Sequence, residues 1–176
     1  MLMLCLSTSG PIASAALIKD EKVISIQRGG RGLTHSQTIM SLAEQAMAAC
    51  GYSPADMDAF AVDAGPGSFT GVRIGVCAVN AMAAAFHKPV VSVSSLEGLL
   101  QGLDNACALI DCRNGNGYAM TVSDEVTLPP SAVVISELLE TLPADILITG
   151  DGAELHRNTI LSALPSARFA EENEVD

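Results

Sequence analysis

The stretch Gly65-Pro66-Gly67-Ser68-Phe69-Thr70-Gly71-Val72-Arg73-Ile74-Gly75 decides the fold, because it joins a predicted strand to a predicted helix. Upstream, residues 59–64 alternate Ala and Val around one Phe, as a buried strand does. Downstream, residues 72–87 have the apolar content of a helix of about four turns. We take as candidate site residues of this loop Gly65, Pro66, Gly67, Ser68, Thr70, Gly71 and Arg73.

Two interpretations of the loop stay open. Four of its eleven residues are Gly, so another group can approach the backbone closely, and amides at the helix N-terminus could hold an anion. Alternatively, the glycines only allow tight packing inside the protein. The spacing matches neither common nucleotide-binding glycine motif, and no Lys follows to reach a phosphate. The loop alone therefore does not predict nucleotide binding.

Composition limits the kind of partner. The chain has 176 residues, of which 49% are hydrophobic, so it can bury a substantial core. Nine Lys and Arg against twenty Asp and Glu give a net charge of -11, which repels a polyanion. If a nucleic acid is involved, another protein must supply the positive surface.

Cysteine usage and hydropathy suggest a soluble, cytoplasmic protein. The five cysteines are scattered, form no C-x-x-C pair and are typical of reduced core residues. The apolar N-terminus lacks a basic start and is better interpreted as a first strand than as a signal sequence. The apolar helix from Val72 contains polar residues and is expected to fall short of a membrane span.

The first half of the chain predicts three strands and two helices around the loop. Short apolar runs at 2–6, 13–19 and 22–28, separated by turn residues, predict an antiparallel meander. Thr34 and Gln37 form a possible capping box before a helix that Gly51 ends, and Pro89 introduces a strand over 90–93. The apolar stripe of this helix consists of Ile39, Leu42, Ala43, Ala46, Met47 and Cys50.

The second half repeats this order more faintly. Strands are predicted over 106–111, 117–123, 125–128 and 145–149, with a short helix over 136–142 and a last helix from Gly150 to about Leu164. The order strand-strand-strand-helix-strand-helix thus occurs twice, which predicts an α/β protein of two related lobes, each a mixed sheet with helices. We expect an N-terminal lobe over 1–100 and a C-terminal lobe over 101–176.

Several motifs together resemble the TsaB (YeaZ) family. The central one is the glycine-rich stretch followed by Pro89-Val90-Val91-Ser92-Val93-Ser94-Ser95-Leu96-Glu97. Others, in the same order as in the family, are Leu6-Ser7-Thr8-Ser9, His35-Ser36-Gln37, Asp111-Cys112-Arg113 with Tyr118, and Gly150-Asp151-Gly152-Ala153. The resemblance extends over essentially the whole chain.

This resemblance implies the two-lobed actin/Hsp70/sugar-kinase (RNase H-like) fold. It also implies a bacterial, non-catalytic accessory subunit for threonylcarbamoyl transfer to adenosine 37 of tRNA. Its partner would be the catalytic paralogue TsaD, as a heterodimer, with the ATPase TsaE in the larger complex and tRNA bound only through that complex. No cofactor of its own is expected, since ATP and metal would be on the partners, and no membrane association is expected.

Three departures from the family pattern bear on chemistry. Ser7 stands where the family's first strand usually has Asp, which removes a magnesium-organising carboxylate. Ser95 and Leu99 stand where the paralogue has the two histidines that hold a metal. Family members also usually continue with a helix and a strand after a segment like 165–169, so we expect that the second lobe here could be incomplete.

Other polar residues have ordinary structural interpretations. His35, His87 and His156 have no second ligand at metal-binding spacing and are expected to be structural or surface residues. Asp111 with Arg113 suggests either a polar site between the lobes or, as we favour, a cap of the turn with Asn114-Gly115.

The two helices of the first half predict an interface. Residues 72–86 are apolar nearly all round, so one side must be covered either by neighbouring parts of the chain or by another subunit. TsaB and TsaD pair through such helices, and this resemblance favours a subunit interface at Ile39, Met40, Met47, Gly75, Ala78, Ala81 and Met82. The alternatives are an ATPase or metallopeptidase of the same superfamily, and a homodimeric scaffold that uses the same helices.

Overall fold

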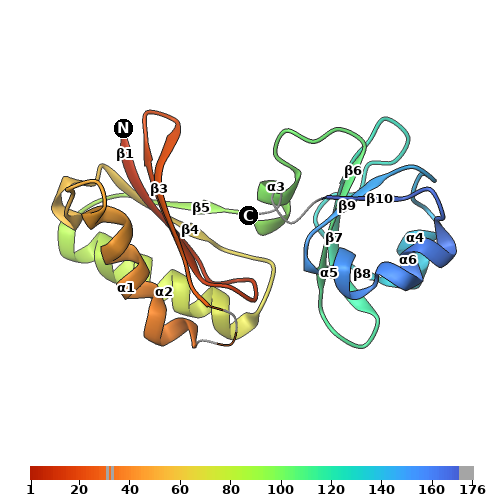
Figure 1. Cartoon of the computed structure of the whole chain (residues 1–176), viewed down its shortest axis with the longest axis horizontal. Helices are drawn as coiled ribbons and strands as arrows, with labels where there is room; N and C mark the ends of the chain where they lie inside the picture. Colours follow the sequence, from red (N-terminus) through yellow and green to blue (C-terminus); the bar gives the residue numbers. More distant parts are fainter. Residues whose placement is uncertain (31, 33, 171–176) are drawn as a thin grey trace. The chain divides into compact units, whose positions relative to one another are not determined.

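The computed structural model describes residues 1–30, 32 and 34–170, which form two units (Figure 1). The first unit is Met1–Ser94 and the second is Ser95–Asp176. The boundary between the units lies before helix α3 (Ser95–Leu100), because α3 packs on strands of the second unit. The boundary predicted from the sequence was after residue 100.

The first unit is built on a five-stranded sheet in the order β3-β2-β1-β4-β5. Its strands are β1 (Leu2–Ser7), β2 (Ser14–Lys19), β3 (Lys22–Arg28), β4 (Ala59–Asp63) and β5 (Val90–Val93). β1 to β3 form the predicted antiparallel meander, while β4 and β5 run parallel to β1. The sequence prediction of these strands is confirmed.

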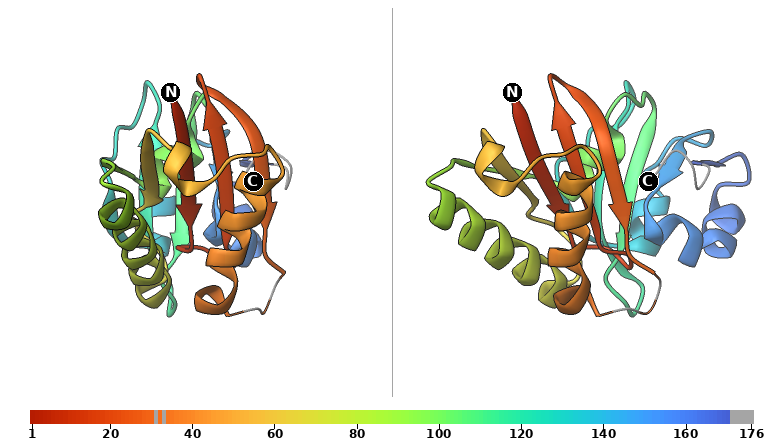
Figure 2. Two further views of the ribbon diagram at one scale, coloured as in Figure 1. Left: turned by 90° about the vertical axis from the view of Figure 1, so that its left-hand side faces the viewer. Right: turned by 60° about the vertical axis from the view of Figure 1, so that its left-hand side comes forward.

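Two helices lie side by side on one face of this sheet, as Figure 2 shows. They are α1 (His35–Ala48) and α2 (Phe69–Phe86), and a short 3-10 turn, η1 (Pro54–Asp56), precedes β4. Five residues of the predicted stripe are buried in one core with alternate sheet residues such as Leu4, Leu6 and Phe60, whereas Cys50 lies beyond the end of α1 and is only partly buried. Thr34 is the N-cap of α1 but its side chain makes no capping hydrogen bond, so the predicted capping box is wrong.

Helix α2 starts at Phe69, three residues before the predicted start, and has 18 residues. With a mean hydropathy of 1.5 it is long and apolar enough, by length and composition only, to cross a membrane. The expectation that it falls short is therefore wrong. The core helix of a soluble protein, which is mostly buried, passes the same test, whereas only 28% of α2 is buried and the helix packs on β4 and β1.

The second unit has a sheet in the order β10-β9-β6-β7-β8. Its strands are β6 (Ala106–Asp111), β7 (Asn116–Val122), β8 (Ser131–Val134), β9 (Leu147–Thr149) and β10 (Arg168–Phe169). Helices α4 (Ile135–Leu139), α5 (Asp151–Leu155) and α6 (Arg157–Ala163) share one core with Cys107 and Leu109, whereas α3 packs with Ala106, Ala108 and Ile110 on the opposite face.

The two units repeat one topology. If β6 to β10 are matched in chain order with β1 to β5, the two sheets have the same strand order. In each unit a helix follows the third strand and another follows the fourth. The predicted duplication of element order is thus present. Two details are wrong: residues 125–128 form no strand, β8 being at Ser131–Val134 instead, and the last predicted helix is two helices that meet at His156.

Candidate functional site

The glycine-rich loop runs from the end of β4 to the start of α2. Gly65 has a φ of 87°, a conformation that favours glycine, and the Gly65–Pro66 peptide bond is cis. Ser68 is the N-cap of α2, where its hydroxyl accepts a hydrogen bond of 3.2 Å from the Gly71 amide. The hydroxyl thus satisfies one of the backbone donors that a helix start leaves without an intrahelical partner.

Three glycines of this region pack against the segment that follows β1. A Cβ at Gly67 would lie 2.6 Å from the Ser9 carbonyl oxygen, and one at Gly71 would lie 2.0 Å from that of Thr8. At Gly75 it would lie 2.6 Å from Thr8 Oγ1. The buried Thr8 hydroxyl donates a 2.7 Å hydrogen bond to the Gly71 carbonyl. These contacts support the close-packing interpretation of the glycines.

A carboxylate that the sequence analysis missed lies beside this contact. Asp63 ends β4, and its Oδ2 accepts hydrogen bonds from Ser7 Oγ, at 2.8 Å, and from Ser9 Oγ. Its Oδ1 accepts one from the Gly65 amide at 2.9 Å. Asp63 therefore ties the end of β1 to the glycine loop. An acidic residue at a strand end just before a glycine-rich turn was the available signal.

The predicted interface residues separate into two groups. Met40 is 49% exposed and Ala81 is exposed, while Ala78 is partly buried. Ile39, Met47, Gly75 and Met82 are buried between the helices and the sheet, so these four do not point outward as predicted. Met47 and Met82 nevertheless line, with Met40, a groove of about 610 Å³ that also includes Tyr52, Pro54 and Phe86.

Helix α2 presents two ridges with a spacing of four residues. Gly71, Gly75, Val79 and Ala83 form the buried ridge. Phe69, Arg73, Cys77, Ala81 and Ala85 form the second ridge, which is exposed along its whole length. We call this second set the outer ridge of α2. Beyond Phe69 and Arg73 its side chains are small, so another helix could approach the backbone closely there.

The second unit contains a polar cluster of Asp111, Asp151 and His156. Asp111 is at the end of β6, and its Oδ1 lies 2.8 Å from His156 Nε2. Its Oδ2 accepts a 3.1 Å hydrogen bond from the Arg113 amide. The Asp111 amide in turn donates to Asp151 Oδ1 at 3.1 Å. Burial raises the pKa of the Asp151 carboxyl, and the Asp111 charge acts in the same direction. Asp111 thus both caps its turn and joins a polar cluster.

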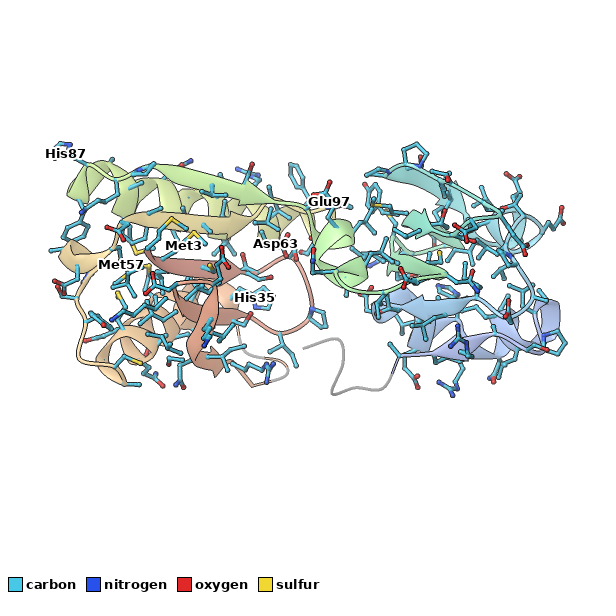
Figure 3. The ribbon with its side chains drawn as sticks, turned by 90° about the horizontal axis from the view of Figure 1, so that it is seen from above. Met3, His35, Met57, Asp63, His87 and Glu97 are labelled. Carbon is cyan, nitrogen blue, oxygen red and sulfur yellow. The ribbon has the colours of Figure 1, made fainter. Side chains whose placement is uncertain are left out.

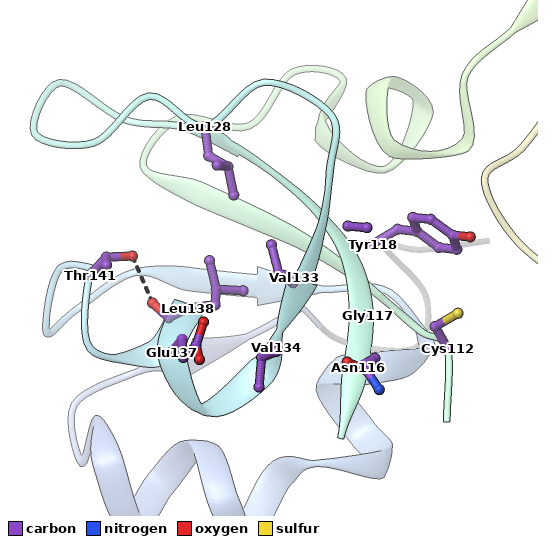
Figure 4. A pocket seen from close by; sticks show the side chains of 11 residues that line it. Cys112, Asn116, Gly117, Tyr118, Leu128, Val133, Val134, Glu137, Leu138 and Thr141 are labelled. Atoms are coloured by element: carbon purple, nitrogen blue, oxygen red, sulfur yellow. Dashed lines mark hydrogen bonds between the residues drawn. The ribbon is translucent and has the colours of Figure 1, made fainter. Parts of the chain in front are cut away.

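A second groove, of about 580 Å³, lies between β7, β8 and α4 (Figure 4). Tyr118 and Cys112 are at one end of it and Thr141 is at the other. A hydrogen bond with Cys112 raises the pKa of the Tyr118 hydroxyl. The rest of the lining is mostly apolar, with Leu128, Val133, Val134 and Leu138.

The histidines do not converge. His35 and His87 lie at opposite ends of the first unit, as Figure 3 shows, and His35 Nε2 contacts the Gly10 carbonyl at 2.9 Å. Ser95 and Leu99 lie on α3. Within residues 1–30, 32 and 34–170, no group of three or more His, Cys, Asp or Glu side chains could hold a metal ion.

Similarity to solved structures shows the fold class of this chain. The putative N-acetylglucosamine kinase of Porphyromonas gingivalis superposes with a TM-score of 0.50 at 10% identity, over 99% of this chain and 96% of that one. YeaZ from Pseudomonas aeruginosa superposes with a TM-score of 0.75 at 26% identity, over 97% of this chain and 84% of that one. The chain has the two-lobed actin-like ATPase and sugar-kinase fold.

Sequence comparison narrows the class to a family. The model described as "TsaD: tRNA N6-adenosine threonylcarbamoyltransferase" matches residues 32–137. The tRNA threonylcarbamoyladenosine biosynthesis protein TsaB of Bacillus subtilis is 29% identical, over 96% of this chain and 79% of that protein. The Haemophilus influenzae protein of the same name is 32% identical, over 70% of this chain but only 54% of its own length. This chain belongs to the TsaD-related TsaB (YeaZ) family.

Proposed function

We propose that this protein acts in tRNA threonylcarbamoyladenosine biosynthesis as a non-catalytic subunit that binds a TsaD-type partner through α1 and α2. The names of its TsaB relatives support the pathway, and the match to the TsaD model supports the kind of partner. The observation that carries the proposal is the outer ridge of α2, which is exposed over the full length of the helix. Helices pack closely where such a ridge meets the groove of another helix.

The contacts of Asp63 support a structural role for the end of β1. Its two oxygens accept hydrogen bonds from Ser7, Ser9 and the Gly65 amide, so the chain itself supplies partners on both sides of the carboxylate. We assign ATP and metal chemistry to the partner proteins, TsaD and TsaE, in the cytoplasm.

Charge distribution supports binding of tRNA only through the complex. Residues 1–94 contain six basic and six acidic residues, so the net charge of -11 comes from the three basic and fourteen acidic residues of 95–176. Neither unit has a net positive charge with which to attract a polyanion.

The test is a binding titration of the full chain with TsaD. Met40→Glu and Ala81→Glu each place a charge on the exposed helix surface, and burying an unpaired charge costs several kcal/mol. We expect each variant to bind more than tenfold more weakly, since about 1.4 kcal/mol is a factor of ten. Leu155→Glu is the control, because Leu155 is 66% exposed on α5 of the other unit.

All three variants should melt like the wild type, since the replaced side chains are exposed. Unchanged TsaD affinity for both Met40→Glu and Ala81→Glu would show that this surface is not the interface. A homodimeric scaffold would instead bury the same surface without TsaD, and size-exclusion chromatography of the chain alone distinguishes the two.

A further inference from the structure

The aromatic side chain of Phe69 is exposed to solvent although glycines on both sides of it in the chain are closely packed. Its neighbours in the glycine-rich loop pack against Thr8 and Ser9, yet 77% of Phe69 is exposed at the first turn of α2. An aromatic side chain that stays in water forgoes the free energy that its burial would contribute. The loop is thus held firmly in a geometry that presents this ring to solvent.

Arg73 lies one turn further along the same ridge. Its guanidinium carbon is 5.2 Å from the centroid of the Phe69 ring, within the range of a cation–π contact. Arg73 is itself exposed, and among the residues that the structure describes no carboxylate forms an ion pair with it. The pair therefore offers one apolar ring face and one cation whose charge no residue of the described chain neutralises.

We propose that Phe69 and Arg73 form an anchor that inserts into the partner protein, in an apolar pocket bordered by a carboxylate. This inference rests on the proposed function, because it takes the partner to be the TsaD-type subunit that packs along the outer ridge of α2. Aromatic and Arg side chains carry much of the binding energy of protein interfaces. The small side chains at Cys77, Ala81 and Ala85 continue from the anchor along the ridge.

A protein fits this anchor better than a single-stranded RNA does. RNA-binding surfaces combine stacking aromatics with a positively charged groove that follows the backbone. Here Arg73 is the only basic residue of α2, and the first unit has no net charge. A partner carboxylate complements one cation, whereas a polyanion needs several.

The first experiment measures TsaD affinity of Phe69→Ala and Arg73→Gln in the full chain. We expect each to weaken binding at least tenfold, about 1.4 kcal/mol. Leu155→Ala is the matched control, because it truncates a side chain that is 66% exposed on the other unit, and it should bind like the wild type. Affinities of Phe69→Ala and Arg73→Gln within twofold of the wild type would overturn the anchor.

A second experiment uses the absence of tryptophan from this chain. Phe69→Trp places a single indole at the anchor, and its emission, taken as the difference from the wild-type mixture, should shift to the blue on titration with TsaD. An unshifted emission at saturation, or quenching by tRNA alone, would overturn the anchor.

The two proposals fail in different ways. If Ala81→Glu abolishes the complex while Phe69→Ala and Arg73→Gln bind normally, the proposed function stands and the anchor is refuted. If the wild-type chain does not bind TsaD at all, both are refuted.

Discussion

Substituting Gly71 by Ala tests whether the glycines serve close packing. In an ordinary helix this change is favourable by about 0.5–1 kcal/mol, because glycine loses more backbone entropy on folding. At this position, however, the new Cβ would lie 2.0 Å from the Thr8 carbonyl oxygen, a distance that requires the backbone to move. We therefore expect the sign of the usual effect to be reversed.

The size of the effect follows from two contributions. Forcing extra volume into a packed site costs about 1–3 kcal/mol. Moving α2 away from β1 also weakens the buried 2.7 Å hydrogen bond between the Thr8 hydroxyl and the Gly71 carbonyl; an unsatisfied buried polar group costs about 1–3 kcal/mol. After the gain in helix propensity is subtracted, a loss of about 1–5 kcal/mol is expected, or about 5–25 °C in the melting temperature of a unit of this size.

Differential scanning calorimetry would compare the melting temperatures of Gly71→Ala and Gly98→Ala with that of the wild type. Gly98 lies in helix α3, where an added Cβ meets nothing within 4 Å, so that variant should be slightly more stable than the wild type. Both substitutions are the same chemical change in a helix, and they differ in the space around the Cβ. A Gly71→Ala variant that melts at or above the wild-type temperature would refute the close-packing interpretation.

Three further predictions concern charge and thiols. Burial raises the pKa of Asp151, so its ionised form destabilises the fold above that pKa. Asp151→Asn should raise the melting temperature at pH 7, with a gain that disappears below about pH 4; an equal gain at pH 3 would contradict this origin. Thiol labelling at pH 8 should modify the exposed Cys77 and Cys112 first and Cys107 only on unfolding, because burial raises the pKa of Cys107 to about 12; early labelling of Cys107 would be the opposite result. The isolated chain should bind tRNA no better than an unrelated acidic protein at physiological salt, and micromolar, selective filter binding would disprove this.

Local sequence patterns were sufficient for much of the fold. The meander of β1 to β3 has short apolar runs with clear turn residues between them, and each strand is where the pattern predicts it. The repeated element order also predicted the two similar sheets. These features depend on neighbouring residues, which a sequence shows directly.

Features that depend on distant contacts were missed. Residues 125–128 resemble a strand, but their bonds to β7 are limited to a few around Thr121, and β8 follows only after Pro129 and Pro130. The predicted last helix is interrupted at His156, whose ring lies 2.8 Å from Asp111, 45 residues earlier in the chain. No local signal at His156 indicates that contact.

The orientation of α2 was the main uncertainty at the site. Because this helix is apolar nearly all round, hydrophobic periodicity could not show which side faces the sheet. The structure shows that Gly71 and Gly75 mark the inner ridge, where they let α2 approach Thr8. With α2 turned so that these glycines face the sheet, Met82 is buried and Ala81 is exposed, and Phe69 and Arg73 point outward.

Depletion of this protein in the organism that encodes it, followed by nucleoside analysis of tRNA, tests the proposed function most directly. We predict that threonylcarbamoyladenosine is lost and that the wild-type chain and Leu155→Glu restore it, whereas Ala81→Glu does not. An unchanged level of the modified nucleoside after depletion would contradict a role in its biosynthesis. Full restoration by Ala81→Glu would contradict the assignment of the partner interface to α2.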